Sequence, residues 1–145
     1  MTKREVRILT ISLLGIQEKD IVVDIGAGTS DIAVCREGTV VGYTMATVAG
    51  DEITEALMRA YLVDYDTAER MKMELGEMSQ ITFTDVLGLE QTYSAEEVMA
   101  AADGAAQNLA SQVAEKIQKL NGGAPSALFL AGGGSKLSTL REKLA

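Results

Sequence analysis

A glycine-containing turn at residues 24–31, with the sequence Asp-Ile-Gly-Ala-Gly-Thr-Ser-Asp, constrains the fold of this chain most. An acidic residue, Asp24, follows the apolar run at residues 21–23, and two glycines come directly after it. Closely spaced glycines let the backbone wrap around an anion, so the turn is typical of a phosphate-binding loop. Because β-type residues continue from Ile32 to Tyr43, we predict that the strand before the turn is followed by a hairpin of two further strands. A dinucleotide-binding loop would instead be followed by a helix.

The charge balance limits the partners that the chain can bind. Its 145 residues suit one domain, and 13 basic against 21 acidic residues give a net charge of −8. This balance opposes non-specific binding to nucleic acid or anionic lipid, and no apolar run approaches the ~20 residues that span a bilayer. We therefore expect no nucleic-acid or membrane partner, and a bound polyanion has to be held locally by backbone N–H groups.

Cysteine and histidine usage narrows the chemistry further. The single Cys35 cannot form an intrachain disulfide, and its apolar neighbours predict a buried core residue. The absence of His removes the usual zinc ligand and general base, so serine or cysteine hydrolase chemistry is not expected. No N-terminal stretch has the apolar core of a signal peptide, which predicts a cytoplasmic, reducing location.

The remaining pattern predicts one domain of alternating strands and helices, with residues 62–93 as a small subdomain insertion. We expect helices at residues 2–15, 50–60, 66–76 and 94–120 and a short one at 137–144, strands at 21–25, 31–36, 39–47 and 127–131, and a second hairpin with one solvated face at 81–84 and 90–93. Asp66 and Gly76 are the expected caps of their helix, and Ser94 with Glu97 forms a capping box. The fully apolar run at 127–131 is typical of a strand inside a parallel sheet.

Two glycine turns each follow an apolar strand, at residues 26–29 and 132–135. The carboxyl ends of strands in an α/β sheet form the crevice where ligands bind, so the two turns point to one shared site. Each turn alone also fits a tight turn without a ligand, because glycine accepts positive φ. A third feature, Gly50-Asp51 at a helix start, adds N–H donors and a carboxylate able to act through a metal-bound water.

Three charged residues have alternative interpretations. Asp24 is costly to bury as an anion without compensation, which favours a water-mediated contact with Mg²⁺ over a purely structural role. Glu69 and Lys72 lie three residues apart on one helix, which by itself fits a solvated ion pair. The Gly-Ser-Lys run at 134–136 does not have the order that a Walker phosphate loop requires.

Four motifs, in order, resemble those of actin-like ATPases. Residues 24–34, 49–54, 68–72 and 130–135 resemble the second phosphate loop, the glycine-acid helix start, the adenosine-contacting helix and the adenosine loop. The likeness covers about residues 21 to 145 and is closest to bacterial DnaK-like chaperone relatives and to the cell-division and cell-shape ATPases of that superfamily. It implies a three-layer α/β lobe of ribonuclease-H-like, actin-type topology, with a mixed sheet and helices on both faces.

This resemblance implies an adenine-nucleotide site for ATP or ADP with Mg²⁺. Asp24 would hold the metal through water, and Glu69 and Lys72 would flank the ribose and adenine, which replaces the ion-pair interpretation. The expected cofactor-binding residues are Asp24, Gly26, Ala27, Gly28, Thr29, Gly50, Glu69, Lys72, Gly132, Gly133, Gly134, Ser135 and Lys136. No catalytic residue is assigned. Ala27 replaces the commoner glycine and Met73 a polar residue of some relatives, which affects the expected affinity and not the fold.

Actin-like ATPases close two lobes on the nucleotide, and their first lobe carries its own Asp-Gly-Thr phosphate loop. The present chain resembles the second lobe alone. We therefore expect binding without efficient hydrolysis, because half of the groups around the transition state are missing. The expected protein partner is a first lobe or a second copy of the chain.

Residues 1–29 resemble a second family, the decarboxylating precorrin methyltransferases of cobalamin synthesis. There the same Asp-Ile-Gly-Ala-Gly-Thr run binds S-adenosylmethionine, and the two families part at Ser30. One alternative is therefore a methyltransferase-like domain that binds S-adenosylmethionine, although the hairpin expected after Thr29 opposes it. The other is a chimera in which a methyltransferase-derived helix at residues 1–20 precedes the ATPase lobe, including an engineered hybrid scaffold without activity.

Overall fold

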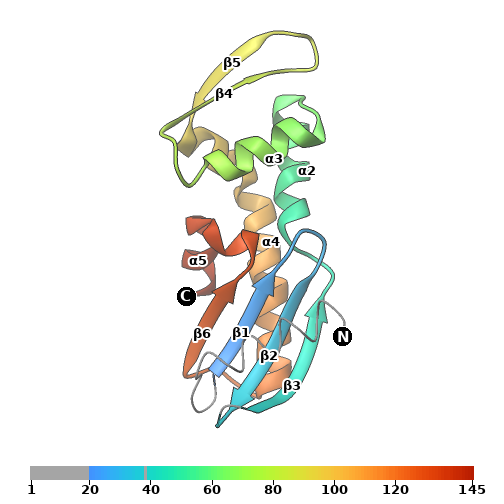
Figure 1. The fold of residues 1–145 in the computed structure, drawn as a ribbon, viewed down its shortest axis with the longest axis vertical. Helices are drawn as coiled ribbons and strands as arrows, with labels where there is room; N and C mark the ends of the chain where they lie inside the picture. The colour runs from blue at the N-terminus through green and yellow to red at the C-terminus, as the bar shows by residue number, and fades with distance from the viewer. Residues whose placement is uncertain (1–19, 38) are drawn as a thin grey trace.

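The computed structural model describes residues 20–37 and 39–145 (Figure 1). The elements, in order, are β1 (Asp20–Ile25), β2 (Ser30–Arg36), β3 (Thr39–Ala46), α2 (Gly50–Tyr61), α3 (Tyr65–Glu74), β4 (Gln80–Thr84), β5 (Glu90–Ser94), α4 (Ala95–Asn121), β6 (Ala127–Ala131), the 3-10 turn η1 (Gly133–Lys136) and α5 (Ser138–Leu144). The helix predicted at residues 2–15 lies outside the described residues.

A mixed four-stranded sheet, in the order β3-β2-β1-β6, forms one end of the molecule. β1 and β2 are antiparallel, as are β2 and β3, whereas β6 runs parallel to β1 and places Ala131 level with Asp24. The strand β2 follows the glycine loop directly, so the predicted strand-turn-strand arrangement is confirmed. The sheet and its packed helices confirm the predicted mixed α/β class.

The position of β6 differs from the prediction. Its parallel pairing with β1 is as expected, but β6 lies at the edge of the described sheet and not inside it. The strand is therefore only half-buried, and the side chain of Phe129 is 45% exposed. An apolar run alone does not distinguish a central strand from an edge strand, because an edge strand also packs apolar side chains against the core, as Leu128 and Leu130 do here.

The main core lies between the sheet and α4. Alternate residues of β1, Ile21, Val23 and Ile25, are fully buried and belong to one cluster with the apolar stripe of α4. The buried stripe consists of Val98, Ala102, Ala106, Leu109, Ala110, Val113 and Ile117. On the opposite side of the strands, Val22 and Cys35 form a smaller cluster with Val40. Burial, and then the charge of Asp20, raises the pKa of the Cys35 thiol, which suits its predicted role as a core residue.

The start of α4 is as predicted, whereas the start of α3 is not. The Ser94 hydroxyl accepts from the N–H of Glu97 while the Glu97 carboxylate accepts from the N–H of Ser94, which completes the capping box. The N-cap of α3 is Asp64 and not Asp66, because Asp64 Oδ1 accepts from the N–H of Thr67 at 2.8 Å. The C-cap of α3 is Leu75, one residue before the predicted Gly76.

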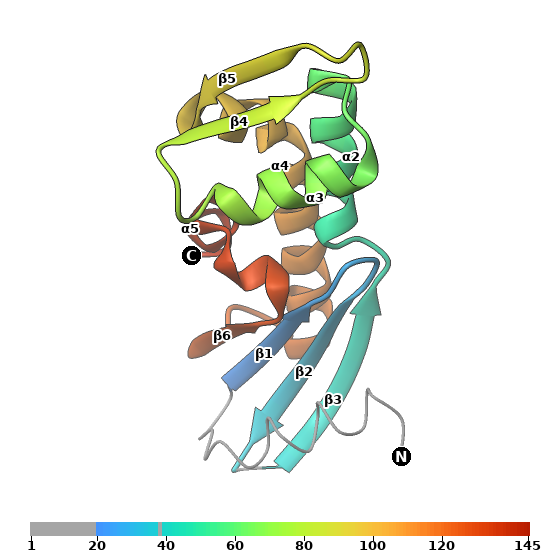
Figure 2. The same ribbon diagram turned by 45° about the horizontal axis from the view of Figure 1, so that its top comes forward.

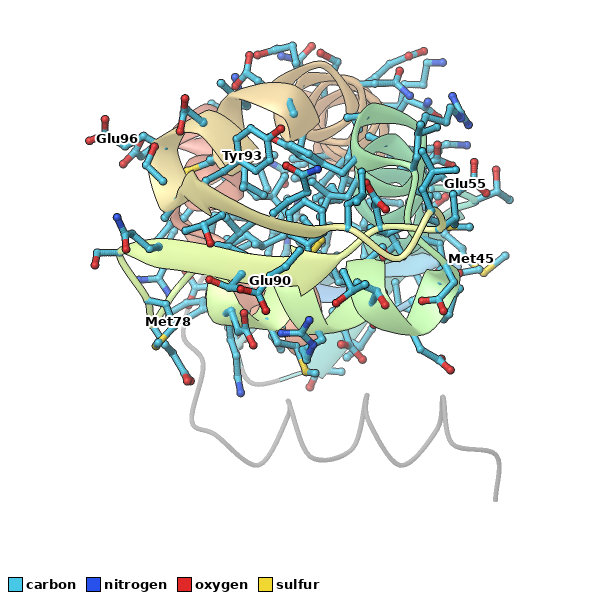
Figure 3. All side chains as sticks on the ribbon, turned by 90° about the horizontal axis from the view of Figure 1, so that it is seen from above. Met45, Glu55, Met78, Glu90, Tyr93 and Glu96 are labelled. Atoms are coloured by element: carbon cyan, nitrogen blue, oxygen red, sulfur yellow. The ribbon has the colours of Figure 1, made fainter. Side chains whose placement is uncertain are left out.

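The strands β4 and β5 form a separate hairpin at the other end of the molecule (Figure 1), and the view from above shows it lying across the helices (Figure 3). Phe83 and Tyr93 lie over Tyr61 of α2, with ring centroids 5.4 and 5.0 Å from the Tyr61 ring. Thr82 is exposed, so the predicted solvated face is confirmed. Figure 2 shows α3 between this hairpin and the η1–α5 segment. The assignment of residues 62–93 as an inserted subdomain stays a prediction.

Within the part of the chain that the structure describes, no helix combines the length and the apolar character needed to cross a bilayer.

Candidate functional site

The loop at residues 26–29 connects β1 to β2 at the carboxyl end of β1. The N–H of Gly26 donates to the carbonyl of Thr29 at 3.0 Å and closes the turn. Ala27, Gly28 and Thr29 are exposed. The loop therefore presents backbone to solvent at the sheet edge where the sequence predicts a phosphate site.

The first turn of α2 is bonded to this loop. The N–H of Gly50 donates to the carbonyl of Gly26 at 3.1 Å, and the N–H of Asp51 donates to the carbonyl of Ala27 at 2.8 Å. In this structure, these two N–H groups fix the loop instead of pointing into open space. The prediction that Gly50 approaches the phosphates stays a prediction.

Asp24 lies near the end of β1, with only 6% of its surface exposed, beside the second glycine turn. A Cβ atom on Gly132 would meet the Asp24 carboxylate and the Ile25 carbonyl, each at 2.4 Å. A Cβ atom on Gly134 would stand 2.3 Å from Cγ2 of Ile25. The second glycine turn is therefore in direct contact with the end of β1, from which the first turn begins, and Gly132 and Gly134 allow η1 to approach β1 that closely.

The η1 turn is held together by its own residues. Ser135 Oγ donates to the carbonyl of Gly132 at 2.6 Å, and the N–H of Ser135 bonds to the same carbonyl at 3.2 Å. Lys136 is exposed, and its carbonyl lies 3.7 Å from the Cβ position of Gly76, just beyond the end of α3. The η1 turn thus lies between the end of β1 and the end of α3 and is close to both.

Glu69 and Lys72 of α3 do form an ion pair, and it is partly buried. Lys72 Nζ lies 2.5 Å from Glu69 Oε1, and the side chains are 14% and 31% exposed, respectively. The same Nζ donates to Thr54 Oγ1 at 2.8 Å and to the carbonyl of Gly50 at 3.3 Å. The pair therefore contacts the first turn of α2, next to the phosphate loop.

The protonation of Glu69 follows from these contacts. Burial raises the pKa of this carboxyl, but hydrogen bonds from Lys72 and Thr54, together with the positive charge of Lys72, outweigh burial and place the pKa below its usual value of 4.5. Glu69 is therefore an anion at neutral pH, and its charge offsets that of the Lys72 ammonium.

The structure thus brings the four predicted motifs together at the carboxyl ends of β1 and β6. The connections run from Asp24 to Gly132, from Gly26 to Gly50, and from Gly50 to Lys72. Sequence reasoning missed Thr54, which is fully buried and bonds to both Glu69 and Lys72. Its position four residues after Gly50, on the same face of α2, is the signal that could have identified it.

Two hollows in the surface lie outside the predicted residues. One of about 650 Å³, between α4, β6 and α5, includes Ile117, Pro125 and Leu130 in its lining. One of about 370 Å³ is lined by Asp51, Tyr65 and neighbouring residues of α2, and the Tyr65 hydroxyl donates to Asp51 Oδ1 at 3.1 Å.

The mixed sheet, with a glycine turn after each of the parallel strands β1 and β6, has the topology predicted for an actin-type lobe. The model of the cell division protein FtsA family matches residues 21–144. The chain belongs to the FtsA family. No curated protein matches the sequence.

Solved structures share this fold at low sequence identity. The ethanolamine utilization protein EutJ from Carboxydothermus hydrogenoformans is 22% identical, with a TM-score of 0.66 over 90% of this chain and 41% of that protein. MreB5 of Spiroplasma citri bound to AMPPNP is 21% identical, with a TM-score of 0.66 over 98% of this chain and 56% of that protein. The same MreB5 bound to ADP is 22% identical, with a TM-score of 0.64 over 98% and 57%. The chain therefore spans about half the length of these proteins.

Proposed function

We propose that this chain is an adenine-nucleotide-binding lobe that holds ATP or ADP with Mg²⁺ at the carboxyl ends of β1 and β6. The observation that carries this proposal is the contact between the second glycine turn and the end of β1, directly before the first turn, where Gly132 lies against Asp24 and Ile25. Such turns at the carboxyl ends of neighbouring strands suit a phosphorylated ligand. The AMPPNP-bound and ADP-bound states of MreB5 support adenine nucleotide as that ligand.

The donor set suits Mg²⁺ held through water. Asp24 supplies a hard carboxylate beside an exposed loop, and among the described residues no three or more His, Cys, Asp or Glu side chains gather into a metal-binding group. Mg²⁺ usually keeps several waters and is bound by one or two carboxylates plus substrate phosphates. Asp24 would orient the hydrated ion, and the ion would supply positive charge against the phosphate oxygens.

We further propose that this lobe binds nucleotide without efficient turnover. The predicted residues resemble those of one lobe of a two-lobed site, whereas phosphoryl transfer requires charge stabilisation from groups all around the phosphate. A first lobe or a second copy of the chain would supply the facing groups. Membership of the FtsA family favours the cell-division branch of the resemblance over the DnaK-like chaperones. A cytoplasmic location remains a prediction.

The methyltransferase alternative is not favoured. The family match begins at residue 21, and a β-strand, not a helix, follows the loop. The chimera hypothesis rests on the resemblance of residues 1–29, of which residues 1–19 lie outside the described part of the chain.

Isothermal titration calorimetry tests the proposed function. ATP and ADP are titrated with and without Mg²⁺, with S-adenosylmethionine as the competing ligand, into the wild type, Asp24→Asn and the control Glu90→Gln. Glu90 is an exposed carboxylate on the remote hairpin. We expect Mg²⁺ to strengthen ATP binding in the wild type and the control but not in Asp24→Asn. Binding of S-adenosylmethionine in place of ATP, or no ATP binding at all, would overturn the proposal.

A further inference from the structure

Thr54 is a fully buried polar residue between α2 and α3. Its hydroxyl accepts a hydrogen bond from Lys72 Nζ at 2.8 Å and donates toward Glu69 Oε1 and toward the carbonyl of Gly50, the latter at 3.2 Å. A hydroxyl has one hydrogen, so Glu69 Oε1 and the Gly50 carbonyl share it as acceptors, while the hydroxyl oxygen accepts from Lys72. Thr54 is therefore the centre of a small buried polar cluster with Glu69 and Lys72.

The Lys72 ammonium is likewise fully engaged. Its three N–H donors face Thr54 Oγ1, Glu69 Oε1 at 2.5 Å and the carbonyl of Gly50 at 3.3 Å. With 14% of the side chain exposed, little water is available to replace a lost partner. The direction of the ammonium therefore depends on the Thr54 hydroxyl.

The peptide group between Gly50 and Asp51 links this cluster to the phosphate loop. Its carbonyl accepts from Lys72, and its N–H donates to the carbonyl of Ala27 at 2.8 Å. The positive charge of Lys72 at the Gly50 carbonyl polarises this peptide group and strengthens the hydrogen bond from the Asp51 N–H to Ala27. The space is tight, because a Cβ atom on Gly50 would stand 3.2 Å from Lys72 Nζ and 3.3 Å from the carbonyl oxygen of Gly26.

We propose that Thr54 is a positioning residue for nucleotide binding: it aims the Lys72 ammonium at the Gly50–Asp51 peptide, which fixes the loop at residues 26–29 relative to α3. This inference rests on the proposed function. Thr54 is buried beneath the site and acts only through Lys72 and Gly50. Loss of its hydroxyl leaves the loop less well organised before the ligand arrives, and the ligand then has to order it at the expense of affinity.

A pair of substitutions at Thr54 separates positioning from packing. Thr54→Val keeps the shape and removes the hydroxyl, whereas Thr54→Ser keeps the hydroxyl and removes a methyl group. We expect Thr54→Val to weaken ATP binding with Mg²⁺ by about 10-fold or more, a loss comparable to that caused by removing the partners that orient metal ligands. Thr54→Ser should bind close to the wild type. Val113→Ala, a core truncation in α4, controls for lost stability.

A second measurement does not need the nucleotide. Amide hydrogen exchange of Asp51, followed by NMR in the ligand-free protein, reports the bond from its N–H to Ala27. We expect faster exchange in Thr54→Val than in Thr54→Ser or Val113→Ala. Unchanged exchange in Thr54→Val overturns the link between Thr54 and the loop.

The calorimetry distinguishes the two proposals. If the wild type does not bind ATP, the proposed function fails, and the exchange rates still decide whether Thr54 orders the loop. If the wild type binds and Thr54→Val binds equally well, the proposed function stands and the positioning role of Thr54 is overturned.

Discussion

The backbone of Gly132 lies against the carboxylate of Asp24, so closely that a Cβ atom on Gly132 would stand 2.4 Å from Oδ1. The φ angle of Gly132 is +81° with ψ at 175°, a region that is essentially restricted to glycine. Two separate constraints, conformation and space, therefore require glycine at this position. The contact holds the second glycine turn against the end of β1, directly before the first turn, and sets the distance between β1 and η1.

Replacement of Gly132 by Ala should destabilise the protein strongly. We expect a loss of at least about 2 kcal/mol in the free energy of unfolding, because the backbone strain and the clash each cost about 1 to 3 kcal/mol. Gly133→Ala is the matched control, since a Cβ atom there meets nothing within 4 Å. Urea denaturation of the two variants provides the measurement. Equal midpoints of urea denaturation for the two variants would contradict this expectation, because they would mean that η1 can move away from β1 to accommodate the added methyl group.

Substitution of Asp64 tests the corrected start of α3. Asp64→Ala removes the acceptor of the Thr67 N–H and leaves a helix N-terminus without its cap. We expect it to lower the midpoint of urea denaturation more than Asp66→Ala, which removes a carboxylate from the first turn but no cap. The reverse order would restore the prediction made from the sequence, in which Asp66 caps the helix.

Local signals in the sequence predicted most of the fold. The capping box of Ser94 and Glu97 identified the start of α4, and β-type residues after the loop identified the hairpin of β2 and β3. The prediction that Asp66 caps α3 was wrong, because Asp64 and Asp66 both precede the apolar pattern and either could have been the cap. The side chain that reaches the N–H of Thr67 is decided by the backbone path and not by composition.

The site was predictable in part. The glycine turns and the Glu69–Lys72 spacing are visible as motifs, and the structure places them together. The buried partner Thr54 was not predicted, because its contacts with Lys72 depend on how α2 packs against α3. The position of β6 at the edge of the described sheet likewise depends on strand order, which an apolar run does not encode.

Truncation of Phe83 should destabilise the protein by about 3 kcal/mol, as is usual for a buried Phe replaced by Ala. Phe83 is 2% exposed and packs on Tyr61 and Tyr93, so its loss leaves a cavity between the hairpin and α2. Leu87→Ala in the same hairpin is the control, because Leu87 is 73% exposed and should change stability by less than about 0.5 kcal/mol. Thermal and urea denaturation measure both variants, and similar losses would mean that the hairpin does not pack as described.

The stability contributed by Glu69 should depend on pH in the acidic range. Although burial acts in the opposite direction, the hydrogen bonds from Lys72 and Thr54 and the charge of Lys72 hold the pKa of Glu69 below its usual value of 4.5. The folded state therefore favours the anion more than the unfolded chain does. The resulting stabilisation is fully present above the unfolded pKa and is lost as the pH falls through the folded pKa.

Comparison of the wild type with Glu69→Gln tests this pH dependence. We expect a constant difference in the free energy of unfolding above about pH 5 and a narrowing difference as the solution is acidified further. Glu115→Gln serves as the control, because the ion pair of Glu115 with Lys119 is exposed and contributes little in water. A difference that widens on acidification would show that Glu69 is neutral in the folded protein. The Lys72 ammonium would then lack its anionic partner, and the polar cluster around Thr54 would need a different proton assignment.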